Sequence, residues 1–341
     1  MPCHKSGRSV VILSGASLLL IILSFADIFI GSVSIPVSEI FLYFTGAPSN
    51  IPNSVILSEF RIPKMLTAIL AGAGLSVAGL LMQTIFRNPL AGPYILGISS
   101  GASLGVSLLL LGFSSIFGAV FSSFVGNWLI ILAAWLGAAF VLVIIFFVST
   151  KVQDVMTILI FGVLLGSAIS AIVGILQFLS KAEELKIFVL WTMGSLSGVT
   201  KEQLQVFIPV VFSGILLSSF QIKNLDVLLL GENYAISSGL NIIRARISIF
   251  FVTSLLAGSI TAFCGPIGFV GIVVPHLARF LMKTALHRTL IPTVAILGAN
   301  VILISDILSN LPIFSGTIPI NSVTSLLGIP VVILIIFKNK I

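Results

Sequence analysis

The chain has 341 residues, of which 58% are apolar and only 8% are charged, and its mean hydropathy is +1.25. Soluble domains carry roughly 25% charged residues, so this chain cannot build a water-facing surface and lipid must be its main solvent. The formal net charge is +7, but the basic residues are scattered rather than gathered on one polar face, so we expect no nucleic-acid partner. At about 20 residues a span, one domain of residues 1–341 has room for roughly ten membrane helices.

Ten apolar stretches follow one another along the chain. They are predicted at residues 10–30, 65–86, 94–111, 128–148, 155–179, 204–220, 247–263, 267–282, 290–308 and 320–337. The expected fold class is therefore all-α, a polytopic integral membrane protein. The basic start of the first stretch resembles a signal peptide, but the apolar run is long and no small-residue cleavage site follows, so we expect it to be kept as a span.

The positions of lysine and arginine between the spans predict the orientation. With a cytoplasmic N-terminus, 12 of the 17 basic residues lie in cytoplasmic segments, and the reverse orientation inverts this bias. Loops rich in Lys and Arg stay in the cytoplasm, so we expect a multi-pass protein of the inner (cytoplasmic) membrane with both termini inside. Residues 31–63 then form an outer segment. Residues 221–246 form the longest inner one, in which Gly231 and Gly239 are expected to stop two short surface helices.

Groups for catalysis or ion coupling are sparse. The sequence contains no H-E-x-x-H and no Gly-Lys dipeptide, so it lacks a Walker A loop. We expect neither an enzyme nor a bound cofactor or metal, and any ATPase must be a separate chain. Asp27, Asp154 and Asp306 lie near predicted span ends and are expected to be solvated there. The scarcity of charge inside the spans argues against a proton-coupled carrier.

Two polar clusters flank the second span. Arg61-Ile62-Pro63-Lys64 precedes it, and residues 87–93, which read RNPLAGP, follow it. Pro89 and Pro93 forbid a continuous helix there, and Asn88 can hydrogen-bond backbone groups freed at such a break. The span between the clusters is rich in Gly, Ala and Ser, which lets helix backbones approach closely in lipid.

The block from Arg61 to Gly105 resembles the signature of the FecCD-type permeases, which import iron-siderophores, haem or cobalamin through ATP-binding cassette (ABC) transporters. Residues 265–279 resemble the second signature of the same family. Further matches follow in the expected order at 191–196, 230–239, 298–306 and 319–330. The residues of the two signatures that we single out are Asn88, Pro89, Gly97, Gly101, Pro275, His276 and Arg279. Outside this resemblance, His276 would be interpreted as a hydrogen-bonded core residue.

The resemblance implies a set of partners. Similar permeases pair as dimers of ten-helix subunits with the pathway between them. Two cytoplasmic ATP-binding subunits contact the inner loops, and a periplasmic or lipid-anchored binding protein delivers the substrate from outside. An inverted repeat of spans 2–5 and 7–10 would fit such a transporter. The sequence alone leaves open which chelate is carried and whether the second permease subunit is identical.

The resemblance also implies roles for individual residues. Arg61 and Lys64 match the outer basic positions that dock the binding protein, and Asn310 stands where a third docking arginine is typical. Ser149 and Thr150 match a region that forms a cytoplasmic gate. The residues that match the ATPase-coupling helices are Leu230, Gly231, Glu232, Ala235 and Gly239. Two rival functions remain at this point, a secondary carrier or channel for a small solute and an integral membrane enzyme.

Overall fold

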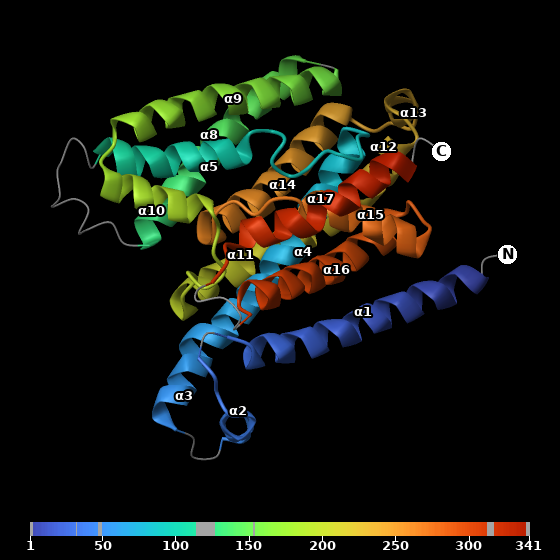
Figure 1. Cartoon of the computed structure of the whole chain (residues 1–341). Helices are drawn as coiled ribbons and strands as arrows, with labels where there is room; N and C mark the ends of the chain where they lie inside the picture. The colour runs from blue at the N-terminus through green and yellow to red at the C-terminus, as the bar shows by residue number, and fades with distance from the viewer. Residues whose placement is uncertain are drawn as a thin grey trace.

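The computed structural model is a bundle of helices and describes residues 3–31, 33–46, 50–113, 127–152, 154–311 and 317–338 (Figure 1). Within these ranges seven helices are long and apolar enough to cross a membrane, and three shorter apolar helices accompany them. The long ones are α1 (Cys3–Phe29), α4 (Ile62–Ile85), α8 (Asn127–Lys151), α9 (Val155–Leu179), α11 (Lys201–Phe220), α14 (Ile242–Cys264) and α16 (His287–Ser309). The shorter ones are α5 (Ile98–Ser107), α15 (Val270–Met282) and α17 (Ile320–Lys338). Each coincides with one predicted span, so the expected all-α polytopic fold is confirmed.

The second span begins earlier than the sequence predicts. Helix α3 (Ile51–Val55) and the π-helical turn η1 (Ile56–Arg61) run directly into α4, and together they form one apolar helical stretch, Ile51–Ile85. Pro63 lacks the N–H that a regular α-helix would pair at this point. The wider turn η1 immediately precedes this proline, and such turns change the hydrogen-bond register without ending the helix. Part of the outer segment 31–63 is therefore helical.

Helix α4 occupies the core because its glycines remove side chains where neighbouring helices cross. A Cβ atom placed on Gly72 would collide with the carbonyl oxygen of Gly298 on α16. One placed on Gly79 would collide with the carbonyl oxygen of Gly271 on α15. Most of the membrane-length window containing α4 is buried, 78% of it, against 6% for α1. The sequence prediction that small residues pack this span closely against its neighbours is confirmed.

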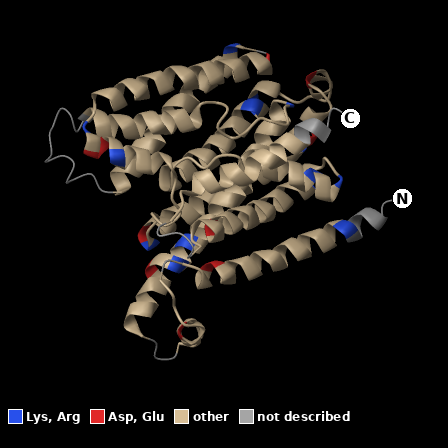
Figure 2. Ribbon diagram, viewed as in Figure 1, with Lys and Arg blue, Asp and Glu red and all other residues tan. Residues whose placement is uncertain are grey.

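The two ends of the bundle differ in the elements that they carry. One end, called here the α2 end, carries α2 (Val37–Thr45), α3 and α10 (Ala182–Thr192). The other, called the α12 end, carries α12 (Ile222–Leu229) and α13 (Glu232–Ser237), and both chain termini lie on this side (Figure 1). Charged residues gather towards the two ends and the helices between them are nearly free of charge (Figure 2). That pattern is typical of a membrane-spanning bundle.

Candidate docking and coupling sites

A buried ionic cluster lies at the α2 end, where α1, α4 and α16 meet. The Nζ atom of Lys64 lies 2.6 Å from Oδ2 of Asp306 and 3.5 Å from Oδ1 of Asp27. The sequence prediction that both aspartates are solvated helix ends is wrong, because Asp27 is 0% and Asp306 only 3% exposed. Carboxylates can be buried here because the Lys64 ammonium offsets part of their lost hydration. We call Asp27, Lys64 and Asp306 the ionic cluster.

Arg61 holds the chain that leaves α1. Its guanidinium donates to the carbonyl oxygens of Ile28, Phe29 and Val33, the second at 3.1 Å. These are carbonyls at or beyond the last turn of α1, which a helix leaves without partners of its own. The arginine passes close to Gly31, where an added Cβ would lie 3.2 Å from its Nη2 atom. Arg61 is only 5% exposed, so most of its hydrogen-bonding capacity is used inside the protein.

Asn310 lies against the same cluster. Its amide nitrogen donates to the backbone carbonyl of Asp306 at 2.8 Å and to the Asp306 carboxylate at 3.0 Å. The Asp306 carboxylate therefore lies between the ammonium of Lys64 and the amide of Asn310. The fold also gathers Arg61, Lys64 and Asn310 around one open cavity of about 420 Å³, to which Ser195, Ser197 and Thr317 add hydroxyl groups. The three residues that the family resemblance assigns to docking thus line one cavity.

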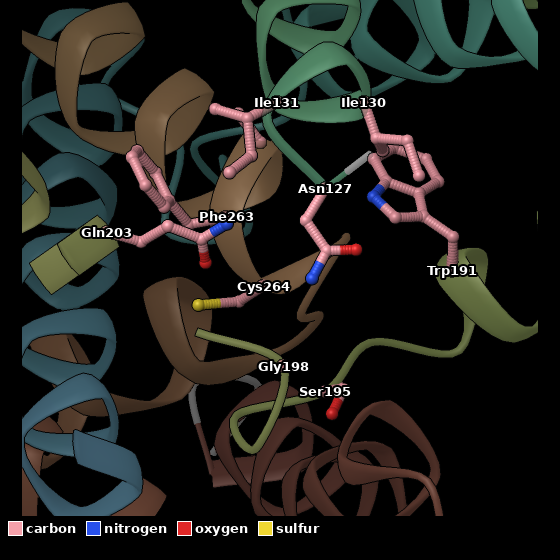
Figure 3. A pocket seen from close by; sticks show the side chains of 10 residues that line it. Asn127, Ile130, Ile131, Trp191, Ser195, Gly198, Gln203, Phe263 and Cys264 are labelled. Atoms are coloured by element: carbon pink, nitrogen blue, oxygen red, sulfur yellow. The ribbon is translucent and has the colours of Figure 1, made fainter. Parts of the chain in front are cut away.

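A smaller cavity of about 130 Å³ lies between α8, α10, α11 and α14 (Figure 3). The amides of Asn127 and Gln203 and the ring of Trp191 surround it, beside the thiol of Cys264. Among the residues that line it there is no carboxylate, histidine or cation. Over the described part of the chain, no three His, Cys, Asp or Glu side chains gather as a metal site would require. The cavity offers hydrogen bonds and an aromatic face without acid–base groups.

The α12 end carries the two short helices expected from the inner segment. Gly231 separates α12 from α13 with φ +119°, and Gly239 follows α13 with φ +83°, values that favour glycine. Ala235 is buried and anchors α13 to the bundle. Leu230 and Ile236 instead are 65% and 61% exposed, and Tyr234 is exposed too. We call Leu230, Tyr234 and Ile236 the apolar patch.

Arg246 joins this surface to the turn after α8. Its Nη2 atom donates to Oε1 of Glu232 at 3.0 Å, and its Nη1 atom donates to the carbonyl oxygen of Val152 at 3.3 Å. The gate residues predicted from sequence, Ser149 and Thr150, lie just before Val152 at the end of α8. Ser149 is buried, whereas Thr150 is exposed and its hydroxyl donates to the carbonyl of Phe147 at 2.8 Å. Arg246 therefore connects the predicted coupling and gate regions, a link that the sequence analysis missed.

Asp154 lies across the same turn and caps the start of α9. Its carboxylate accepts the N–H of Thr157 at 2.9 Å, the N–H of Met156 at 3.2 Å and the hydroxyl of Thr157 at 2.6 Å. These bonds, with that from the Thr157 hydroxyl foremost, hold the pKa of Asp154 below its usual range. The carboxylate is exposed, as expected from sequence.

A second buried polar contact ties α12 to the membrane helices. Nδ1 of His287 lies 2.6 Å from Oδ1 of Asp226 on α12, and the same oxygen accepts the backbone N–H of His287 at 3.0 Å. Nε2 of His287 lies 2.8 Å from the hydroxyl oxygen of Thr84 near the end of α4. Thr84, Asp226 and His287 therefore form one chain of polar contacts. The sequence analysis assigned none of these three residues a role.

The two family signatures meet in the fold. The carbonyl oxygen of Pro89 lies 2.7 Å from Nε2 of His276, so a hydrogen bond joins the polar loop after α4 to α15. Nη1 of Arg279 donates to Oε1 of Gln83 at 2.6 Å. Asn88 accepts the N–H of Leu90 at 2.9 Å and so supports the proline-containing turn. Pro275 is buried within α15 beside these contacts.

The remaining two signature residues are required by backbone geometry. Gly97 has φ +79° at the start of α5. A Cβ on Gly101 would lie 2.5 Å from the carbonyl oxygen of Gly137, so this glycine lets α5 approach α8. Both positions therefore shape the fold around the α4–α5 turn.

The chain is similar to known transport proteins over nearly its whole length. A model of the FecCD transport family matches residues 19–338. The hemin transport system permease protein HmuU of Yersinia pestis is 34% identical over 285 residues, which is 83% of each chain. The vitamin B12 import system permease protein BtuC of Photorhabdus laumondii is 34% identical over 283 residues, covering 83% of this chain and 82% of its own. A solved chain described as an inward-facing metal-chelate type ABC transporter has a TM-score of 0.82 at 28% identity, over 97% of this chain and 99% of that one.

Proposed function

Because the chain belongs to the FecCD transport family, we propose that it is the membrane permease subunit of an ABC importer that moves a metal chelate inward, a ferric siderophore, haem or cobalamin. The named relatives are permeases of hemin and vitamin B12 import systems. The similar solved chain comes from a metal-chelate type ABC transporter, which disfavours a secondary carrier or channel. No step of such transport requires a covalent reaction by this subunit.

The observation that carries the proposal is the apolar patch at the α12 end. Tyr234 and Ile236 are exposed on α13, and Leu230 is exposed in the turn between α12 and α13. Apolar side chains gathered on a water-facing surface mark a contact with another protein. We assign this contact to the ATP-binding subunits, one for each permease of a dimer. Gly231 and Gly239 set the ends of α13, and Ala235 holds it against the bundle.

We assign the α2 end to the outer face and the α12 end to the cytoplasm. This places both chain termini inside, in agreement with the bias of lysine and arginine along the sequence. The membrane is then the cell's inner (cytoplasmic) membrane. The end of α8 with Ser149 and Thr150 lies on the cytoplasmic side, where a gate would close the inner end of a pathway between two permease subunits.

The cavity of Arg61, Lys64 and Asn310 is the docking surface in this proposal. Its cations are not free charges, because Lys64 is paired with Asp27 and Asp306 and Arg61 is bonded to three carbonyls. A carboxylate from a binding protein would therefore meet a site of little net charge, where the hydroxyl groups of Ser195, Ser197 and Thr317 offer hydrogen bonds. Such a site sets the register of docking more than its strength. Asn310 contributes an amide where a third arginine is typical of the family, consistent with this neutral character.

Uptake measurements test the proposed function. Cells that lack this permease are given labelled haem, cobalamin or a ferric siderophore, with and without the gene restored on a plasmid. We expect restored uptake of one chelate, and none when the partner ATPase carries an inactivated Walker A lysine. Uptake that continues without ATP hydrolysis would establish a secondary carrier instead. Uptake of none of the chelates, by a permease that is present in the membrane, would reject the substrate class.

A further inference from the structure

Helices α4 and α16 lie side by side through the centre of the bundle (Figure 1). Glycines bring their backbones into direct contact halfway along. A Cβ on Gly298 would collide with both the carbonyl oxygen of Gly72 and the hydroxyl of Ser76. Two helices in such close contact cannot slide past each other without steric overlap, because packed interiors are bistable rather than continuously deformable.

Polar contacts join the same two helices at both ends. At the α2 end the ion pair of Lys64 and Asp306 joins α4 to α16 across 2.6 Å. At the α12 end Thr84 and His287 join them again across 2.8 Å. All four side chains are at least nine-tenths buried. Breaking either contact would leave buried polar groups without hydrogen-bond partners, which costs free energy. Helices α4 and α16 are therefore held together at both ends.

At the α12 end, this helix pair is hydrogen-bonded to the short helix α12. His287 bonds Asp226 on α12 through its ring at 2.6 Å and through its backbone N–H at 3.0 Å. Arg87, just beyond α4, donates to the carbonyl oxygen of Leu228 on α12 at 3.1 Å. Helix α12 therefore has one polar attachment to the start of α16 and one to the end of α4.

We propose that α4 and α16 act as one rigid strut between the docking cavity and α12, and that Thr84 and His287 are the positioning residues that fasten its cytoplasmic end. The inference rests on the proposed function, because it needs a binding protein at one end and an ATPase at the other. A displacement of α12 by the ATPase then reaches Lys64, Asp306 and the cavity beside them without bending the helices. By linkage, ATP binding inside must change the affinity for the binding protein outside by the same factor as docking changes ATP affinity.

The test measures that factor in the complete complex. The permease, its ATPase subunits and the binding protein are reconstituted in nanodiscs, with the ATPase unable to hydrolyse ATP. The dissociation constant of the binding protein is measured with and without ATP, and the ratio of the two values is the coupling factor. Thr84→Val removes the hydroxyl that faces His287 and keeps the side chain's shape. We expect it to bring the coupling factor at least about threefold closer to one.

Two matched variants separate this effect from general damage. Thr84→Ser keeps the hydroxyl and should restore the wild-type coupling factor. Glu59→Gln removes an exposed ion pair with Lys201, 3.6 Å apart, and should leave the factor unchanged. A coupling factor in Thr84→Val equal to that of the wild type would overturn the proposal.

Asp226→Ala keeps the proposal testable if Thr84→Val does not fold. Asp226 is partly exposed on α12, so its loss removes the attachment of α12 to α16 without disturbing the packing of α4 on α16. We expect the same reduction of the coupling factor, with binding of the ATPase retained. An unchanged factor in this variant overturns the strut, as does a wild-type factor of one. A wild-type permease that binds no ATPase overturns the proposed function itself.

Discussion

The ammonium of Lys64 lies 2.6 Å from the Asp306 carboxylate, although the two residues are 242 positions apart in the chain. With Asp27 on α1, this pair connects three helices at one depth. The ammonium has two carboxylates within 4 Å, so it cannot be exchanged for a neutral group without leaving them unbalanced. Lys64, which the family resemblance assigns to docking, therefore also joins α1, α4 and α16.

Lys64→Met should destabilise the protein strongly. Removing one partner of a buried ion pair costs about 3–5 kcal/mol, because the remaining charge is left uncompensated. We expect a clear drop in the unfolding temperature in detergent, measured by tryptophan fluorescence. The triple variant Lys64→Met, Asp27→Asn, Asp306→Asn should recover much of it, since no unpaired charge remains. Equal stability of Lys64→Met and the wild type would show that the ionic cluster makes no net contribution to stability.

Asn310→Arg should alter docking through Asp306. The new guanidinium would reach the carboxylate that Asn310 now bonds, compete with Lys64 for it and add one positive charge to the cavity. An acidic binding protein should then bind more tightly, by less than about tenfold, and with a steeper dependence on salt. Binding is measured between 50 and 500 mM salt, with Asn310→Gln as the neutral control. A gain that persists undiminished at high salt would contradict an electrostatic origin.

Glu232→Arg should uncouple ATP hydrolysis from transport. It sets two guanidinium groups against each other, because Glu232 now pairs with Arg246 across 3.0 Å. We expect ATPase activity to continue while uptake per ATP falls several-fold. The exchanged pair Glu232→Arg with Arg246→Glu should restore part of the uptake, since opposite charges face each other again. Full uptake in the single variant would remove this pair from the coupling path.

Single cysteines should reveal the orientation. Ser54 lies on α3 and Ser237 on α13, at opposite ends of the bundle. In a variant whose own two cysteines are replaced by serine, a membrane-impermeant maleimide added to intact spheroplasts should label residue 54 and spare residue 237. Opening the membrane should make both reactive. Labelling of residue 237 in sealed spheroplasts would reverse the assigned topology.

The sequence predicted the spans well because each needs only a long apolar stretch, and that is a local property. The sequence also predicted the ends of α13, because a glycine in a polar segment between spans commonly ends a helix. The start of the second span was placed too late because the sequence does not show that α3 and η1 continue the helix ahead of Pro63. Asp27 and Asp306 were misjudged because their burial depends on a lysine that is distant in the sequence. The family resemblance supplied residues at both ends of the bundle but not Thr84, Asp226, Arg246 or His287, whose contacts at the α12 end join elements far apart in the sequence.

The exposed side chains of Leu230, Tyr234 and Ile236 also bear on how the cell makes this protein. In the proposed complex, a copy inserted into the membrane without its ATPase would hold these groups towards the cytosol, where they attract chaperones, proteases and other nascent chains. The amount of mature permease should then follow the supply of its partner, and overproduction of the permease alone should yield material that is rapidly degraded. Synthesis of the two chains in balanced amounts would avoid that loss.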